Sequence, residues 1–273
     1  MKKFFVSLAA LMLAAGLSYA QDLSEATETA KSAVEAFESG NKTEALTLFN
    51  QALELATACG EAGNDIVSQC KAAIPTISLS LAKEEYNAKN FVDAAKMFAE
   101  AAAVAEKYEA FDVVEEATSL IPKAYFGGAN ALLNNKQFAE AVELYKKVIE
   151  LEPENANAIL RLGMALNGAG NTEEAISTFL LAKDKGKEKD AVKQLCNIYT
   201  KQAAASLKGK KFAEAVEAAG KIIECRGYRT VHGMWYYFTV ADDRIDLNSQ
   251  NYLVITTLEA YQKMAAYYGK DAL

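Results

Sequence analysis

The sequence has very little histidine and proline and no excess of basic residues. Among its 273 residues there are one histidine (His232), three prolines and fifteen glycines. A single histidine argues against histidine-based metal sites and against a histidine-dependent nucleophile. The 29 basic and 36 acidic residues give a net charge of −7. Binding to phosphates requires a basic face, so we expect no nucleic-acid partner.

What is present is the composition of a globular protein. Apolar residues make up 51% of the chain and charged residues 24%, which excludes disordered and fibrous classes. The length is sufficient for one large or two ordinary domains with a sizeable core.

Residues 1–20 have the layout of a secretory signal. Lys2 and Lys3 precede an apolar run from Phe4 to Leu17, and small residues at Ser18 and Ala20 follow. We expect cleavage after Ala20 and export to the periplasm or exterior of a bacterial cell. The alternative is an N-terminal membrane anchor, which the shortness of the run disfavours. No later stretch is long and apolar enough to span a membrane, so we expect no integral membrane segment after cleavage.

A repeated spacing organises the following two hundred residues. An alanine is followed four residues on by an aromatic and three further by a small or aliphatic residue, and Ala or Gly stands twelve residues before each anchoring alanine. The last copy lacks the aromatic. The copies are Ala45-Phe49-Ala52, Ala94-Phe98-Ala101, Ala141-Tyr145-Val148, Ala175-Phe179-Ala182 and Ala215-Ala219-Ile222, preceded by Ala33, Ala82, Ala129, Gly163 and Ala203.

The spacing predicts helix hairpins. Residues i, i+4 and i+7 share one helical face, and small residues on one helix allow an antiparallel partner to approach closely. Turn residues rich in Gly, Asn and Lys fall between the paired helices, for example at Ser39–Lys42 and Gly168–Asn171. We therefore expect pairs of nested helices joined by short turns.

These residues resemble the tetratricopeptide repeat (TPR) family. The fourth copy is the most similar, with Ile159, Leu162, Gly163 and Leu166 on its first helix, and Pro153 follows the end of the third copy. The resemblance covers about residues 26–225. It implies stacked helix pairs with a concave groove that binds other proteins.

The repeat departs from regularity in its first half. Anchor spacings run 49, 47, 34 and 40 residues. The long intervals contain Pro75 and Pro122, which we interpret as the restart or kink after an extra helix in the second and third copies. The predicted fold is all-α, an α-solenoid of about five TPR-like hairpins, two of them with extra helices.

The C-terminal segment, residues 226–273, is rich in aromatics. Val254, Leu258, Tyr261, Ala265 and Tyr268 form an apolar stripe at helical spacing, which predicts an amphipathic helix. We expect this segment to cap the repeats of residues 21–225. An aromatic patch for a peptide or glycan is the alternative.

Four cysteines remain, and export favours disulfides. Their places at helix ends predict bridges Cys59–Cys70 and Cys196–Cys225, with buried free thiols as the alternative. The sequence gives little support for a catalytic or metal site. His232 has no nucleophile or acid in a recognisable pattern near it, and Asp242, Asp243 and Asp246 do not fit the calcium-binding loop of an EF-hand. We expect no metal, no cofactor and no catalytic residue.

The resemblance also indicates where a ligand would bind. In the family it lies along the first helices, and Lys, Asn and Arg there hold a terminal carboxylate in some members. The corresponding candidates are Lys83, Tyr86, Asn87, Lys123, Phe126, Asn130, Asn157, Arg161, Met164 and Lys201. The alternative is an ordinary solvated face.

The predicted function is a non-catalytic adaptor or scaffold of the bacterial envelope that binds a protein or peptide. The alternative is a component of an envelope or outer-membrane assembly complex. An enzyme dependent on His232 is a third and weaker interpretation.

Overall fold

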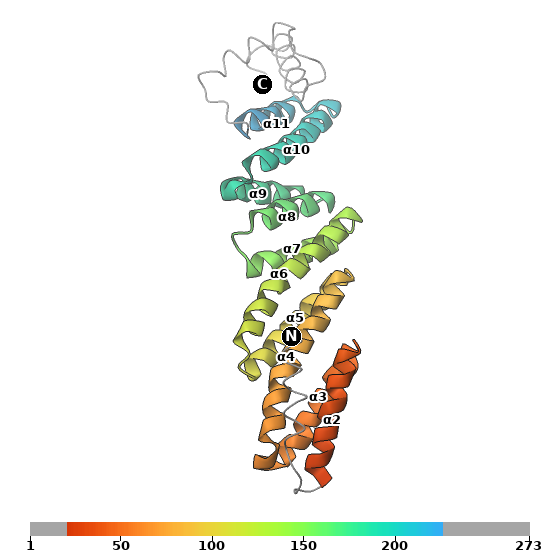
Figure 1. Ribbon diagram of the computed structural model, residues 1–273. Helices are drawn as coiled ribbons and strands as arrows, with labels where there is room; N and C mark the ends of the chain where they lie inside the picture. Colours follow the sequence, from red (N-terminus) through yellow and green to blue (C-terminus); the bar gives the residue numbers. More distant parts are fainter. Residues whose placement is uncertain (1–20, 226–273) are drawn as a thin grey trace, which may run out of the picture. The chain divides into compact units, whose positions relative to one another are not determined.

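The computed structural model describes residues 21–225, the side chains of Gln21 and Ile223–Cys225 excepted, and all regular structure in this range is helical (Figure 1). The predicted signal and C-terminal cap lie outside it. The helices are α2 (Gln21–Glu38), α3 (Lys42–Ala58), α4 (Asn64–Asn87), α5 (Phe91–Lys107), α6 (Phe111–Asn134), α7 (Phe138–Leu151), α8 (Ala156–Gly168), α9 (Thr172–Ala182), α10 (Glu188–Lys208) and α11 (Phe212–Cys225). Short helical turns occupy Gly60–Gly63 and Lys183–Lys187.

The chain divides into two compact units, residues 1–131 and 132–273. In the first unit α2 packs on α3, α3 on α4, and α4 on α5. In the second unit α7 packs on α8, α8 on α9, α9 on α10, and α10 on α11. The predicted nested hairpins α2–α3 and α4–α5 are therefore confirmed in the first unit, and α8–α9 and α10–α11 in the second.

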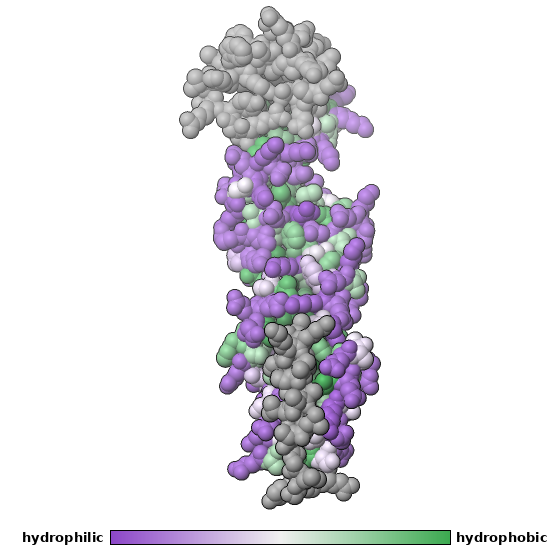
Figure 2. Space-filling model, in the orientation of Figure 1, coloured by the Kyte–Doolittle hydropathy of each residue, from purple (hydrophilic) through white to green (hydrophobic). Residues whose placement is uncertain are grey.

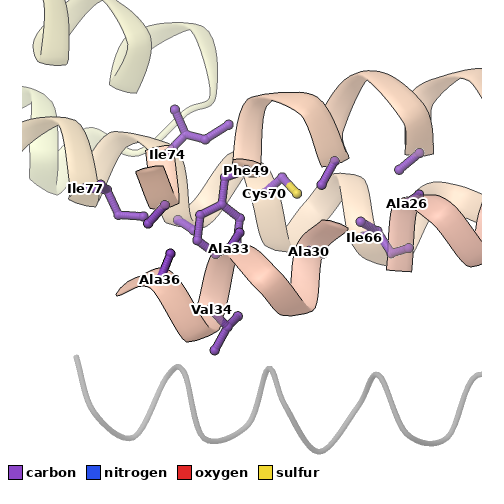
Figure 3. Packing of buried hydrophobic residues seen from close by; sticks show 14 residues of the cluster. Ala26, Ala30, Ala33, Val34, Ala36, Phe49, Ile66, Cys70, Ile74 and Ile77 are labelled. Atoms are coloured by element: carbon purple, nitrogen blue, oxygen red, sulfur yellow. The ribbon is translucent and has the colours of Figure 1, made fainter. Parts of the chain in front are cut away.

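The repeated residues form the contact surface of the hairpins. Ala45, Phe49, Ala94, Phe98 and Tyr145 are all completely buried. So are the small residues predicted on the facing helices, Ala33, Ala82, Ala129 and Ala203. Figure 3 shows the Phe49 ring of α3 beside Ala33 of α2, with Cys70 and Ile74 of α4 nearby. A small residue opposite the aromatic, as Ala33 is opposite Phe49, allows the two helices to approach closely.

Gly163 shows how closely the two helices of a hairpin approach. A Cβ atom at this position would lie 2.7 Å from Cε1 of Phe179, on the partner helix α9. The aromatic of the repeat thus occupies the space that a side chain on α8 would need.

The turns inside the hairpins share one backbone geometry. Each contains one residue with positive φ: Gly40 (88°), Lys89 (67°), Lys136 (61°), Gly170 (90°) and Lys210 (58°). A left-handed residue after the last helical turn is the usual way in which a helix ends before a short reversal. The Gly-, Asn- and Lys-rich segments that predicted turns therefore all reverse the chain with the same backbone conformation.

One backbone hydrogen bond closes each of these turns. The N–H of the residue after the left-handed position donates to the carbonyl five residues earlier, at 2.8–3.0 Å. The acceptors are Ala36, Glu85, Leu132, Leu166 and Ser206. This bond satisfies a helix-end carbonyl that would otherwise lack a partner.

The prediction that the extra residues form separate helices is wrong. The additional residues lengthen the first helix of the hairpin, so that α4 and α6 each run 24 residues with Pro75 and Pro122 inside. Both prolines are buried. In α4 the part before Pro75 contributes Ile66 and Cys70 to the same buried cluster as α3, and we attribute the continuity of the helix to this packing.

The predicted Cys59–Cys70 disulfide is not formed. Cys59, Cys70 and Cys196 are free cysteines, and the side chain of Cys225 lies outside the described side chains. The Cys59 thiol donates to the carbonyl of Leu55 in its own helix at 3.2 Å. Cys70 is completely buried two turns into α4, and burial raises the pKa of its thiol to about 12. Placement near helix ends did not make these two side chains meet.

Candidate functional site

The candidate ligand-binding residues all lie on first helices of hairpins, as the sequence predicted. The structure divides them between the two units. Lys83, Tyr86 and Asn87 of α4 and Lys123, Phe126 and Asn130 of α6 belong to the first unit, and Asn157, Arg161 and Met164 of α8 and Lys201 of α10 to the second. Each unit therefore contains its own set of candidates.

Lys83 forms an ion pair inside the first unit. Its Nζ lies 2.6 Å from Oε1 of Glu116, and the pair joins α4 to α6. The two side chains are 40% and 53% exposed, so the pair contributes little to stability. Glu116 was not identified from the sequence, although it lies on a first helix, as Lys83 does.

Tyr86 packs against the second helix of its own hairpin. Its ring meets Phe91 edge-on, with centroids 5.4 Å apart, and lies 6.2 Å from the ring of Phe98. This geometry is favourable for aromatic pairs. Tyr86 is half-buried against the core cluster of the hairpin, so its ring contributes to the packing of α4 on α5.

The other candidates of the first unit differ in exposure. Asn87 and Lys123 are exposed, whereas Phe126 and Asn130 are half-buried. A Cβ atom on Gly127 would lie 2.8 Å from Cε1 of Phe91. The close approach of α5 and α6 at Gly127 therefore fixes the helix turn that carries Phe126 and Asn130.

In the second unit, the start of α8 is held by its cap. The Asn155 side-chain oxygen accepts a bond from the Ala158 N–H at 3.0 Å, and the Asn155 amide donates to Glu152. Lys185, in the turn after α9, binds both carboxylate oxygens of Glu154 at 2.5 and 2.7 Å. These contacts set the register of the helix that carries Asn157, Arg161 and Met164.

Arg161 contacts the second helix of the preceding hairpin. Its cation lies close enough to Tyr145 on α7 to act on the pKa of the tyrosine hydroxyl. Tyr145 is completely buried and Arg161 half-buried. Burial raises the pKa of the Tyr145 hydroxyl, and the adjacent Arg161 cation partly offsets that rise. The sequence placed Arg161 among the candidates and Tyr145 on the buried face of its repeat, but it did not predict that the two residues are close.

The remaining candidates of the second unit are Asn157 and Lys201, both exposed, and Met164, which is half-buried. Asn157, Arg161 and Met164 share one face of α8 because they lie four and three residues apart. Arg161 is the single charged residue of α8, and α10 carries four lysines against two acids. The first helices of this unit are therefore basic within an acidic chain.

Polar side chains cover most of the visible surface of the described residues (Figure 2). Between residues 21 and 225, the structure contains no group of three His, Cys, Asp or Glu side chains that could hold a metal ion. None of the helices in that same range combines the length and apolar character needed to cross a membrane.

Helix hairpins follow one another along the chain, and each is closed by the same turn. In all but the last copy, the repeat also contains a buried aromatic residue. These features define the all-α solenoid class of repeat protein. Residues 132–198 match the family model described as tetratricopeptide repeat. This match assigns the tetratricopeptide repeat to residues 132–198 of the chain. Proteins of this family generally mediate protein–protein interactions and are typically non-catalytic scaffolds.

Comparison with solved structures finds other TPR proteins at low similarity. MamA from Desulfovibrio magneticus RS-1 is 16% identical, with 76% of this chain and 97% of that chain covered and a TM-score of 0.30. YrrB, described as a TPR protein with an unusual peptide-binding site, is 15% identical over 76% and 90%, also at 0.30. The TPR2AB domain of yeast Sti1 in complex with pHSP90 is 17% identical over 85% and 98%, at 0.28. No curated protein matches the chain.

Proposed function

We propose that this protein is a non-catalytic scaffold that binds an extended segment of another protein against the first helices of its hairpins. The observation that carries the proposal is the arrangement in the second unit, where α8 and α10 present Asn157, Arg161 and Lys201 on helices whose opposite faces are buried. TPR proteins generally bind partners on this side, and these residues offer hydrogen-bond donors at successive hairpins.

The charge of these helices indicates the chemistry of the partner. A chain with a net charge of −7 repels acidic partners overall, yet the first helices of the second unit are basic. Opposite charge close to the contact favours association and orients the partner. The segment bound by the second unit is therefore acidic, or ends in a free carboxylate.

We further propose that the protein works in the bacterial cell envelope after export. Lys2, Lys3 and the apolar run from Phe4 to Leu17 support export, and Ser18 to Ala20 support cleavage. The mass of the protein purified from its native host tests this proposal. Cleavage after Ala20 would give a chain beginning at Gln21, and an N-terminus at Met1 would reject it.

Affinity capture tests the binding function. Wild-type protein and the double variant Arg161→Glu with Lys201→Glu serve as baits in envelope extract, and Lys96→Glu is the matched control. Lys96 lies on the second helix α5 and its side chain is 64% exposed. The proposal expects a partner that wild type and the Lys96 variant retain and that the double variant loses. Equal retention by all three would reject the first-helix face.

A further inference from the structure

Two neighbouring leucines near the end of α9 face solvent. Leu180 is 43% exposed and Leu181 is 46% exposed, and they directly follow the buried ring of Phe179. In the other copies of the repeat, neither of the two corresponding positions holds a large apolar residue. Those positions hold Asn50 and Gln51, Ala99 and Glu100, Lys146 and Lys147, and Gly220 and Lys221. A pair of leucines thus stands where the repeat otherwise has residues suited to water, and this calls for an explanation that a single exposed leucine would not need.

Both leucines belong to the outward face of α9. They lie three and four residues after the exposed Ser177, so the three side chains share one face of the helix. Leu181 also lies seven residues after Glu174, whose carboxylate lies 3.8 Å from Nζ of Lys146 on the second helix α7. The two leucines are therefore on the side of the unit formed by second helices, away from the contact of α9 with α8.

The small area of this apolar face indicates what covers it. Each partner in a stable protein–protein complex buries about 800 Å², which is much more than two half-exposed leucines provide. A second copy of the chain would therefore gain too little from this face alone. A segment of the same chain needs less, because its covalent link holds it at an effective concentration in the millimolar range.

The end of α11 is well placed to supply such a segment. Short connections join α8 to α9, α9 to α10 and α10 to α11, and each helix packs on the next. Chain direction therefore alternates, and α11 runs parallel to α9. Cys225, at the end of α11, lies at the same edge of the unit as the last turn of α9, which carries Leu180 and Leu181. Since both helices pack on α10, their axes are at most about 20 Å apart.

Residues 226–273 lie outside the described residues, but their sequence provides an apolar stripe between Val254 and Tyr268. A relaxed coil of the length of residues 226–253 spans about 25–30 Å, which is enough to return from Cys225 to α9. A helix of residues 254–268 is about 21 Å long. One such helix can therefore contact both α11 and α9.

We propose that residues 226–273 fold back over the second helices of the second unit and cover Leu180 and Leu181 with the apolar stripe of residues 254–268. The segment then binds the outside of α9 in addition to covering the end of the repeats. This contact leaves the candidate residues on the first helices α8 and α10 free, so it does not depend on the proposed function.

A photoreactive residue in place of Leu181 tests this contact in the full chain. Unlabelled and isotope-labelled protein are mixed before irradiation, and crosslinked peptides are identified by mass spectrometry. The proposal expects links from position 181 to residues 226–273, with the same isotope in both linked peptides. Links between peptides of different isotope would show that a second copy occupies this face and would overturn the proposal.

A photoreactive residue in place of Glu100 is the matched control. Glu100 is exposed and occupies in α5 the position that Leu181 occupies in α9. It should give no link to residues 226–273. Similar yields from both positions would mean that the segment touches the surface without preference, and an absence of links from position 181 would mean that it does not cover the leucines. Either result contradicts the proposal.

Hydrogen exchange tests the role of the two side chains themselves. The double variant Leu180→Asn with Leu181→Gln gives α9 the residues of the first copy, and the hairpin should keep its fold because both positions are exposed. Amides of residues 254–268 should exchange at least about tenfold faster in this variant than in wild type. Phe111→Gln, which removes a 68% exposed apolar side chain from α6, should leave their exchange unchanged. Equal exchange in wild type and the double variant would overturn the proposal.

Discussion

At the scale of single residues, the molecule depends on where a Cβ atom can and cannot fit. A Cβ on Gly63 would lie 1.9 Å from the backbone oxygen of Ala56. At Gly220, inside α11, there is nothing within 4 Å. Two glycines that look alike in the sequence therefore have opposite relations to their surroundings.

We expect Gly63→Ala to destabilise the protein by about 3 kcal/mol, because a backbone atom cannot move aside as a side chain can. Gly220→Ala should stabilise it by about 0.5–1 kcal/mol, since alanine is the better helix former. Urea unfolding followed by circular dichroism measures both. A harmless Gly63→Ala would show that the close approach of α3 and the turn Gly60–Gly63 is relaxed in solution.

A second residue-scale prediction concerns Cys70. Its thiol has a pKa of about 12 in the folded protein, against an ordinary value of 9.0. Above pH 9 the unfolded chain loses this proton first, so the free energy of unfolding falls as pH rises and is unaffected below that range. The loss is about 1.4 kcal/mol between pH 7 and 10.

Unfolding of wild type and Cys70→Ala at both pH values isolates this effect from other titrating groups. The variant should be less stable at pH 7, yet it should lose less stability on going to pH 10. Parallel losses in the two proteins would contradict the assignment.

At the scale of elements, the hairpin turns are set by one left-handed residue each. Lysine holds this conformation at positions 89, 136 and 210, and glycine holds it at 40 and 170. Left-handed backbone costs a residue with a side chain about 1 kcal/mol, and glycine escapes this cost. The five turns therefore have the same shape but different intrinsic stability.

Lys136→Gly should stabilise the turn between α6 and α7 by about 0.5 kcal/mol, after allowance for the greater freedom of glycine in the unfolded chain. Gly170→Ala should destabilise the turn between α8 and α9 by about 1 kcal/mol. Denaturant midpoints of the two variants should move in opposite directions. Movement in the same direction would mean that contacts of these side chains, and not backbone conformation, decide the effect.

Most of the helices and their buried faces could be predicted from the sequence. The repeat of Ala45, Phe49 and Ala52 predicted both the helices and their buried faces, because the spacing that makes one face of a helix is also the spacing that packs it. The continuity of α4 through Pro75 could not be predicted, since it depends on packing against α3. Nor could the failure of Cys59 to meet Cys70, which depends on side-chain directions that spacing does not specify. The candidate residues were placed on first helices by their register, and the structure has them there. The ion pair between Lys83 and Glu116 could not be predicted, because it forms between two hairpins.

At the scale of the whole molecule, a stack of hairpins has exposed ends. Residues 226–273 lie outside the described structure, and their stripe of Val254, Leu258, Tyr261, Ala265 and Tyr268 suits a helix that covers α10 and α11. A chain ending at Cys225 should therefore melt at a lower temperature and bind a hydrophobic dye. An unchanged melting curve without dye binding would assign these residues another role, such as the alternative aromatic patch.

In the proposed function, a partner lies against the first helices of the hairpins. The most direct measurement is site-specific photo-crosslinking in living cells of the native host. A photoreactive residue at Asn157 or Lys201, both exposed on first helices, should capture the same partner, whereas one at Ser177, exposed on the second helix α9, should capture none. Crosslinks from Ser177 in place of Asn157 and Lys201 would contradict the account.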